Sequence, residues 1–418
     1  MKTASQIWID RHIAGNIARL MNLAVIPLGK ILNIDHSLQK NFTRIAVCKY
    51  KGMGSIIQSM PLVRSLRNNY PEARITYIST VSNKGILKEI KDVDEMVVLD
   101  DRSFFRLVIN IIPFVFRLLS RRFEVYIDLE VYSNFSTLIT ILSKAKNRMG
   151  FYLNSMSYRM GNYTHMMYYN TRSPISETYL QFARLLECKT IQTEIPGLSS
   201  EIKKVNTRDG MTLEIENEKL IVINPNASEL RIERRWDGLK YASLAERLQD
   251  EFPEYKILFI GAPSESNYVD WVMSQIKNKN AVYSVAGTTN IKELIALISG
   301  AELFISNDSG PMHIAFSTGT SVLALFGPCS PEQYGVNENC KLIYAHLYCS
   351  PCVHEFVAPP CKGNNYCMKV IETETVFEAA TSMLTGRPMP EKHDSSMIFK
   401  LGEKFNNFTI GTFARADK

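Results

Sequence analysis

Hydrophobic and polar residues alternate along most of the chain in a pattern that predicts short buried strands separated by amphipathic helices. A first series of strands is expected at 44–50, 74–80, 95–100 and 123–130. A second series is expected at 219–225, 255–261, 281–287, 303–308 and 321–327. Strands that alternate with helices pair in parallel through right-handed crossovers. The pattern therefore predicts an α/β fold with two doubly wound, Rossmann-like domains.

The two series divide the chain into five segments. We expect an amphipathic N-terminal extension at 1–43, a first Rossmann-like domain at 44–205, a linker at 206–218, a second Rossmann-like domain at 219–386 with a cysteine-rich loop at 349–367, and a polar tail at 387–418. A chain of 418 residues is too long for one ordinary core. Ligands of such sheets bind at the carboxyl ends of the strands, so a cleft between two facing domains is expected to hold the site.

The net charge limits the classes of binding partner that are expected, and the N-terminal sequence limits the expected cell compartment. The net charge of +6 is small and the basic residues form no regular stripe, which argues against nucleic acid. Anionic small molecules and an anionic membrane surface both fit this balance. Asp10, Arg11 and His12 interrupt the early apolar run, and no cleavage site follows, so a cytoplasmic location is expected.

Two stretches are more apolar than a water-soluble surface requires, although neither reaches the roughly 18 residues of a bilayer span. Residues 7–34 place apolar side chains at helical spacing, and residues 104–122 mix bulky apolar side chains with four arginines. Either stretch fits a helix lying in the headgroup region of a membrane. A core helix with solvated arginines remains the alternative, so a peripheral position at the inner membrane stays open.

The sequence "NDSGPMH" joins a strand directly to a helix. Gly310 permits a tight turn, Asp308 or Ser309 can cap the helix, and Pro311 suits its first turn. The free N–H groups of such a helix start bind phosphate well. A capped turn without a ligand and a core role for His313 are the structural alternatives.

Two further loops follow strands of the second domain. Asn226 comes directly after the first of them, and Arg234 and Arg235 precede the next helix, where they could neutralise a diphosphate without a metal ion. Gly261, Pro263 and Glu265 follow the next strand and could reach a sugar hydroxyl. A solvated loop is the alternative for the two arginines.

Together these pieces resemble glycosyltransferase family nine, the bacterial lipopolysaccharide heptosyltransferases. That family carries N-P-x-A, basic-basic-Trp, G-x-P-x-E and D-S-G-P-M-H elements and an L-F-G-P strand end. Here they stand at 224–227, 234–236, 261–265, 308–313 and 325–328. The resemblance implies the two-domain GT-B fold around a central cleft, an ADP-heptose-like nucleotide-sugar donor, and inversion at the anomeric carbon with no cofactor.

The resemblance also implies residue roles. Asn226, Asp308, Ser309, Gly310, Pro311 and His313 become donor contacts, Glu265 contacts the nucleoside, and Arg234 contacts the diphosphate. The first domain then binds the acceptor, a lipopolysaccharide core or another lipid-linked glycan. The family more often has lysine at the Arg234 position, a change that keeps the charge.

The acceptor side departs from the family pattern. Ser55 stands where the family has the aspartate regarded as the base, and an unassisted serine is too weak a base. Asp128 and Glu130, at the end of a predicted strand, are the candidate replacements, with Glu130 preferred. Either could take the proton, while Ser55 and Lys51 are expected to orient the acceptor and Gly54 to contact it. A catalytically inactive nucleotide-sugar-binding or assembly protein is the alternative function.

Four cysteines cluster near the end of the second domain. Cys349, Cys352, Cys361 and Cys367 are separated by two, eight and five residues, a spacing that a structural zinc or an iron–sulfur cluster could use. His354 is a spare ligand candidate. A disulfide pair and reduced thiols are the alternatives.

Overall fold

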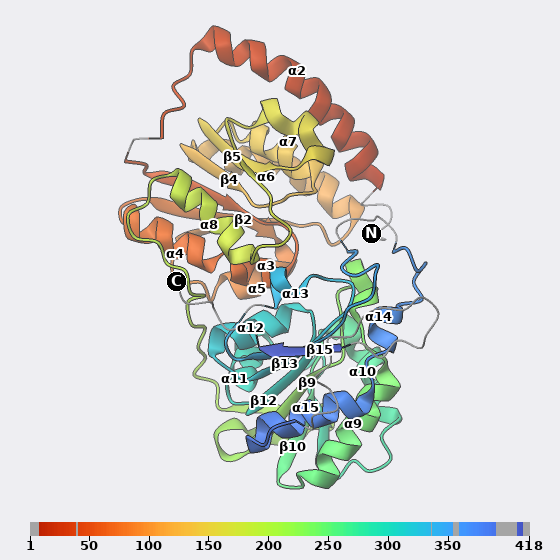
Figure 1. The fold of residues 1–418 in the computed structure, drawn as a ribbon. Helices are drawn as coiled ribbons and strands as arrows, with labels where there is room; N and C mark the ends of the chain where they lie inside the picture. Colours follow the sequence, from red (N-terminus) through yellow and green to blue (C-terminus); the bar gives the residue numbers. More distant parts are fainter. Residues whose placement is uncertain (1–7, 39–40, 336, 354–358, 390–407, 413–418) are drawn as a thin grey trace. The chain divides into compact units, whose positions relative to one another are not determined.

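The computed structural model describes residues 8–38, 41–335, 337–353, 359–389 and 408–412. The chain divides into two compact units, Met1–Pro196 and Gly197–Lys418, each with its own parallel sheet (Figure 1). The two units are described separately below.

The sheet of the first unit has six parallel strands in the order β3-β2-β1-β4-β5-β6. The strands are β1 (Arg44–Cys48), β2 (Arg74–Thr80), β3 (Glu95–Leu99), β4 (Val125–Asp128), β5 (Asn147–Tyr152) and β6 (His165–Tyr168). β1 lies near the middle of the sheet and is buried from Ile45 to Cys48, as expected for a strand covered on both faces.

Helices connect these strands. They are α3 (Met53–Gln58), α4 (Met60–Asn69), α5 (Lys84–Leu87), α6 (Phe104–Arg121), α7 (Asn134–Leu142) and α8 (Ile175–Leu185), with the 3-10 segments η2 (Val81–Asn83) and η3 (Asn154–Asn162). Phe114 and Leu118 of α6 and Ile139 of α7 share one core cluster with strand residues. That buried stripe on α6 has the helical spacing that the sequence predicts.

The N-terminal helices η1 (Asp10–Ala14) and α2 (Gly15–Leu32) pack on the first unit. The Asp10 carboxylate accepts hydrogen bonds from the backbone N–H groups of Asn134 and Phe135 at 3.0 and 2.8 Å. A carboxylate at a helix start satisfies N–H groups that lack partners within the helix. Asp10 thereby joins the extension to the start of α7.

The sheet of the second unit repeats this order as β11-β10-β9-β12-β13-β14 and adds β15, which pairs antiparallel with β14. The strands are β9 (Lys219–Asn224), β10 (Tyr255–Phe259), β11 (Val282–Ser284), β12 (Leu303–Asn307), β13 (Val322–Phe326), β14 (Cys340–Ala345) and β15 (Phe408–Thr412). A separate hairpin, β7 (Lys204–Asn206) with β8 (Thr212–Glu214), and η4 (Ile215–Asn217) occupy most of the segment expected as a linker.

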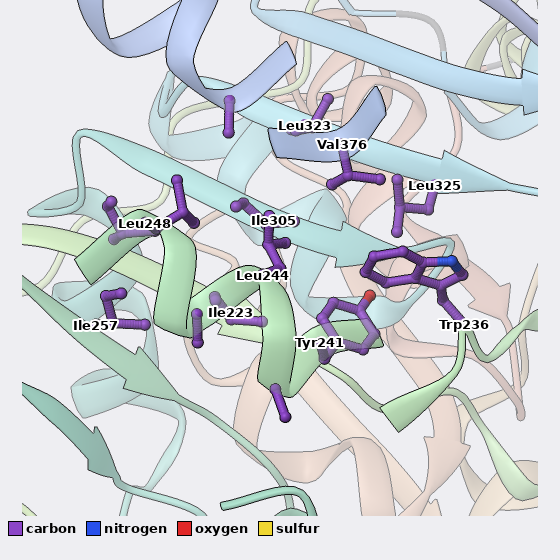
Figure 2. Close-up of a cluster of buried hydrophobic side chains, with 14 of the residues drawn as sticks. Ile223, Trp236, Tyr241, Leu244, Leu248, Ile257, Ile305, Leu323, Leu325 and Val376 are labelled. Carbon is purple, nitrogen blue, oxygen red and sulfur yellow. The ribbon is translucent and has the colours of Figure 1, made fainter. Parts of the chain in front are cut away.

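The helices of the second unit are α9 (Gly238–Glu251), α10 (Ser266–Ser274), α11 (Ile291–Ser299), α12 (Gly310–Thr318), α13 (Pro331–Tyr334), α14 (Tyr366–Lys369) and α15 (Thr373–Thr385), with the 3-10 segments η5 (Glu229–Arg234) and η6 (Pro263–Glu265). The indole of Trp236 is fully buried beside Tyr241, with ring centroids 4.8 Å apart (Figure 2). Its Nε1–H donates to the carbonyl of Ile371 at 2.9 Å, so α15 is held against the loop before α9.

Two connections contain more than one helical segment. Helices α3 and α4 are separate and meet at Ser59. The β2–β3 connection contains η2 and the short helix α5. No helix among the described residues has the length and apolar character needed to cross a bilayer.

Candidate functional site

Polar side chains gather at the carboxyl ends of β9, β10 and β12, which are neighbours in the second sheet. Asn224 ends β9, Asn307 ends β12, and Gly261 follows β10. Asn224 Nδ2 donates to the hydroxyls of Ser309 at 2.9 Å and Ser306 at 3.3 Å. The fold thus brings the predicted residues 226, 261 and 308–310 to one edge of the second sheet.

Helix α12 begins at this edge without a side-chain cap. Ser309 occupies the N-cap position, but no side-chain hydrogen bond reaches the first-turn N–H groups. Its hydroxyl is instead held by Asn224 and Ser306. The predicted side-chain cap by Asp308 or Ser309 is therefore wrong, because Asn224 at the end of β9 hydrogen-bonds to the serine hydroxyl instead. The backbone donors of the first turn carry the partial positive charge of the helix.

Arg234 and Asp308 form an ion pair beside this helix start, with Nη1 and Oδ2 3.3 Å apart. Burial works against the charge on Arg234, but Asp308, together with Cys329, Tyr334 and Glu233, outweighs burial and raises the arginine pKa. Burial lowers the pKa of His313 to about 4, with the charges of Asp308 and Arg234 acting in opposite directions. The buried imidazole is therefore neutral at pH 7 and can offer an uncharged N–H or nitrogen.

Arg235 and Glu265 lie in other surroundings. The guanidinium of Arg235 stacks over the ring of Tyr268 at 3.8 Å, whereas Arg234 pairs with Asp308. The Glu265 carboxylate accepts from the backbone N–H of Ala262 at 2.8 Å and so shapes the loop after β10. A Cβ on Gly261 would lie 3.0 Å from Asn226 Nδ2, so glycine permits the close approach of these two loops.

Several buried polar atoms at this edge have no hydrogen-bond partner within the described residues. They are Asn226 Oδ1 and the Nε atoms of Arg234 and Arg235, while Asp308 Oδ2 has no hydrogen bond but lies in the ion pair with Arg234. Buried polar atoms are normally satisfied, so a group of them at one strand edge is typical of a ligand site. The acceptor, carboxylate and guanidinium groups suit a ligand with both hydroxyls and phosphates.

Two members of the site were not singled out from sequence. Asn307 accepts from the Trp236 N–H and the Tyr241 hydroxyl, both at 3.0 Å, and donates to the Asn226 carbonyl at 3.1 Å. Its position at the end of a predicted strand was the available signal. Cys329 is buried beside Asp308 and lies three residues after the end of β13. No motif or strand boundary in the sequence pointed to this cysteine.

The corresponding edge of the first unit holds Glu130, but its carboxylate is fully engaged. Oε2 pairs with Lys49 Nζ at 2.8 Å, and Oε1 accepts from the backbone N–H groups of Tyr50 and Lys51 at 2.8 and 3.0 Å. Burial acts to raise the Glu130 pKa, but Lys49 and the backbone donors outweigh burial and lower it. A low pKa and three donors make Glu130 a weak proton acceptor as it stands.

Asp128 lies deeper still. Its side chain is fully buried and accepts from Ser136, Tyr163 and the Glu130 N–H, with Arg159 as its ion partner at 3.4 Å. Burial raises the pKa of Asp128. β4 ends at Asp128, so Glu130 lies in the loop that follows the strand.

Lys51 lies in the β1–α3 connection, and Gly54 and Ser55 lie in the first turn of α3. Lys51 is exposed, Gly54 is buried and Ser55 is half-buried. The Ser55 hydroxyl contacts the phenol of Tyr179, which gives the serine a packing partner in α8.

The four clustered cysteines line one small cavity together with Glu233 and Pro328. All eight cysteines are free thiols in this structure. Burial raises the pKa of Cys352 to about 11 and that of Cys367 to about 12. Among the described residues no three Cys, His, Asp or Glu side chains are arranged to hold a metal ion. His354 lies outside the described residues.

Each unit has a doubly wound sheet of order 3-2-1-4-5-6. The carboxyl edge of the second sheet also carries an uncapped helix start and an arginine. This is the arrangement of the GT-B class of glycosyltransferase fold. The profile of glycosyltransferase family 9 (heptosyltransferase) matches residues 114–360, which is more than half of the chain. The chain belongs to this family.

Individual relatives agree with this assignment. Lipooligosaccharide heptosyltransferase 2 of Campylobacter jejuni is 34% identical over 173 residues, which cover 40% of this chain and 51% of that protein. The chain thus spans about half the length of the curated relatives it matches first.

Two solved structures share the fold. ADP-heptose lipopolysaccharide heptosyltransferase II of Escherichia coli has a TM-score of 0.64 and 19% identity, over 82% of this chain and 99% of that one. The dodecameric, iron-containing heptosyltransferase TibC, known from enterotoxigenic E. coli, has a TM-score of 0.52 and 10% identity, over 83% and 77%.

Replacing Glu130 with glutamine should lower the free energy of unfolding by about 3 kcal/mol, because Lys49 loses its ion partner in a largely buried position. Folding lowers the pKa of Glu130, so the ionised carboxylate stabilises the folded state at pH values above its ordinary pKa of 4.5. This stabilisation is lost as the pH falls through the lowered pKa of the folded state. Glu130→Gln should therefore also weaken the acid dependence of stability. Urea unfolding between pH 3 and pH 8 measures both effects.

Glu216→Gln is the matched control, since its ion pair with Lys203 is exposed at 63% and 68%. Such a pair contributes at most about 1 kcal/mol. Equal losses in the two variants would contradict a structural role for the Lys49–Glu130 pair.

Proposed function

We propose that this chain is an inverting glycosyltransferase that transfers a heptose or related sugar from a nucleotide-diphosphate donor to a lipid-linked glycan of the lipopolysaccharide-core type. The observation that carries the proposal is the uncapped start of α12 beside Arg234 and the unpartnered polar atoms around it. Membership of a heptosyltransferase family and relatives that use ADP-heptose support the choice of donor.

The donor residues have distinct roles in this proposal. The first-turn N–H groups of α12 and the guanidinium of Arg234 stabilise the diphosphate oxygens as they gain charge on leaving. The neutral His313 adds a hydrogen bond without adding charge. Asn226 and the loop at Gly261 and Glu265 hold the nucleoside side. No metal ion is required for this stabilisation.

A nucleotide-sugar-binding protein without transferase activity is the second candidate. The observation that favours it is the engagement of both predicted base residues, Asp128 and Glu130, in buried networks. Donor binding accompanied by no ADP release in the presence of lipooligosaccharide acceptors would favour this candidate.

Donor binding should be visible as thermal stabilisation by ADP-heptose or ADP. A ligand at one hundred times its dissociation constant adds about 2.7 kcal/mol to the free energy of unfolding. Arg234→Ala should reduce the affinity at least about tenfold, as expected for loss of a charge-assisted phosphate contact. Arg247→Ala is the matched control, because Arg247 pairs with Glu374 between α9 and α15. Equal binding by Arg234→Ala and wild type would contradict the proposed diphosphate site.

The cysteine cluster is proposed to hold one zinc or iron ion that stabilises the loop next to the donor site. Four thiols around one cavity are a suitable donor set, and TibC is an iron-containing relative in fold. Since no three ligands are arranged around a common point in the described residues, binding requires side-chain rotation. The backbone N–H groups of Cys352 and Val353 donate to the Pro328 carbonyl, so hydrogen bonds hold the loop next to the end of β13.

Elemental analysis of anaerobically purified protein tests the cluster. We expect about one zinc or iron per chain, as for a tetrahedral four-cysteine site. Cys352→Ser should lose the metal and lower the thermal midpoint. Cys188→Ser, at a thiol of the first unit outside the cluster, should retain it. Absence of zinc and iron from the wild-type protein would contradict the proposal.

A peripheral position on an anionic, cytoplasmic membrane surface is proposed for the first unit. Helix α6 buries Phe114 and Leu118 but exposes Phe105, Ile112 and Phe116 at 72%, 63% and 66%. Residues 102–122 contain five arginines and no acid, and residues 11–34 contain no acid either. An apolar helix face bordered by arginines suits anionic lipid.

Vesicle co-sedimentation tests the membrane surface. The protein should bind phosphatidylglycerol vesicles better than phosphatidylcholine vesicles, and added salt should weaken the difference. Phe105→Ser with Ile112→Ser should lower the partition coefficient at least about tenfold, because each buried side chain contributes about 1.5–3 kcal/mol. Ile202→Ser with Leu239→Ser, on the second unit, is the control. Equal binding by both double variants would contradict the assignment to α6.

A further inference from the structure

The carboxyl edge of the first sheet carries four carboxylates directly at or after a strand end, and three of them are engaged. Asp128 is buried against Arg159, and Glu130 is paired with Lys49. Asp100 pairs with Arg102 and Arg106 at 2.7 and 3.1 Å. Asp101, the fourth, has no side-chain hydrogen bond to another of the described residues, and the charge of Lys51 acts on its carboxylate.

The register of the sheet places Asp101 close to the level of Lys51, in the β1–α3 connection that leads to Ser55. Cys48 of β1 pairs with Ile78 of β2, which pairs with Val97 of β3. Lys51 lies three residues beyond that row and Asp101 four residues beyond it. Adjacent strands are about 4.8 Å apart, so β1 and β3 are separated by roughly 10 Å at this level. A long lysine side chain and a bound sugar both fit that distance.

Contacts between the loops hold this arrangement in place. The carbonyl of Tyr50 accepts from Asn83 Nδ2 at 2.8 Å and from the Thr80 hydroxyl at 3.1 Å. Thr80 is in turn the register partner of Leu99, two residues before Asp101. The β1 and β3 ends are therefore tied together through the end of β2. Asp101 itself is half-buried, and burial raises its pKa while the charge of Lys51 opposes the rise.

We propose that Asp101 is the base that accepts the proton of the acceptor hydroxyl, a role that rests on the proposed transferase function. The acceptor oxygen forms a bond to the anomeric carbon while the bond from that carbon to the diphosphate oxygen breaks. The hydroxyl proton passes to an Asp101 carboxylate oxygen, and the bonding electron pair leaves with the diphosphate. Lys51 lies beside Asp101 and orients the acceptor. Ser55 has no part in the proton transfer.

The test is ADP release from ADP-heptose with lipooligosaccharide from a heptose-deficient strain as acceptor. Asp101→Asn should lower kcat about 10²- to 10⁴-fold, the usual contribution of a general base. Its affinity for ADP, measured by thermal stabilisation, should equal that of the wild type, which shows that the variant is folded. Asp101→Glu should recover part of the lost kcat, because it restores a carboxylate.

Asp100→Asn is the matched control, since it changes the neighbouring carboxylate that is already paired with two arginines. It should retain the wild-type kcat. An active wild type with an equally active Asp101→Asn variant would overturn the role of Asp101 and leave the transferase proposal intact. A wild type that binds ADP-heptose but releases no ADP with this acceptor contradicts both proposals.

Discussion

Parallel strands buried on both faces leave one main place for polar chemistry, namely the ends of the strands. In both sheets the central strands are almost wholly buried, from Ile45 to Cys48 in β1 and from Leu220 to Asn224 in β9. Charged and amide side chains therefore concentrate where the strands stop. Each unit presents such an edge, but the two edges use their polar groups differently.

At the edge of the second unit, amides connect the core to the ligand site. Asn307 receives hydrogen bonds from Trp236 and Tyr241, two of the largest side chains of the core, and donates to the backbone of Asn226. Asn224 meanwhile holds the Ser309 hydroxyl away from the helix start. Packing and site are thus coupled, because the same asparagines satisfy core donors and position the residues that surround α12.

At the edge of the first unit, carboxylates serve the fold. Glu130 joins β4 to the loop after β1 by accepting from Lys49 and two backbone N–H groups, and Asp128 joins β4 to α7 and η3. A buried carboxylate must be paired, so each forms a structural link that removes it from contact with solvent. The serine at position 55 is consistent with a base supplied from another strand end.

The sequence alone determined the two α/β series and the family, because strand and helix periodicity and the motif at 308–313 are local properties of the chain. It also predicted which donor residues share an edge, since parallel strands align their carboxyl ends. It could not determine that Ser309 bonds to Asn224, that Glu130 pairs with Lys49, or that Asp101 comes under the charge of Lys51 from another strand end. Those outcomes depend on partners about 80 residues away or on another strand, and only the tertiary structure decides between competing partners for one polar group.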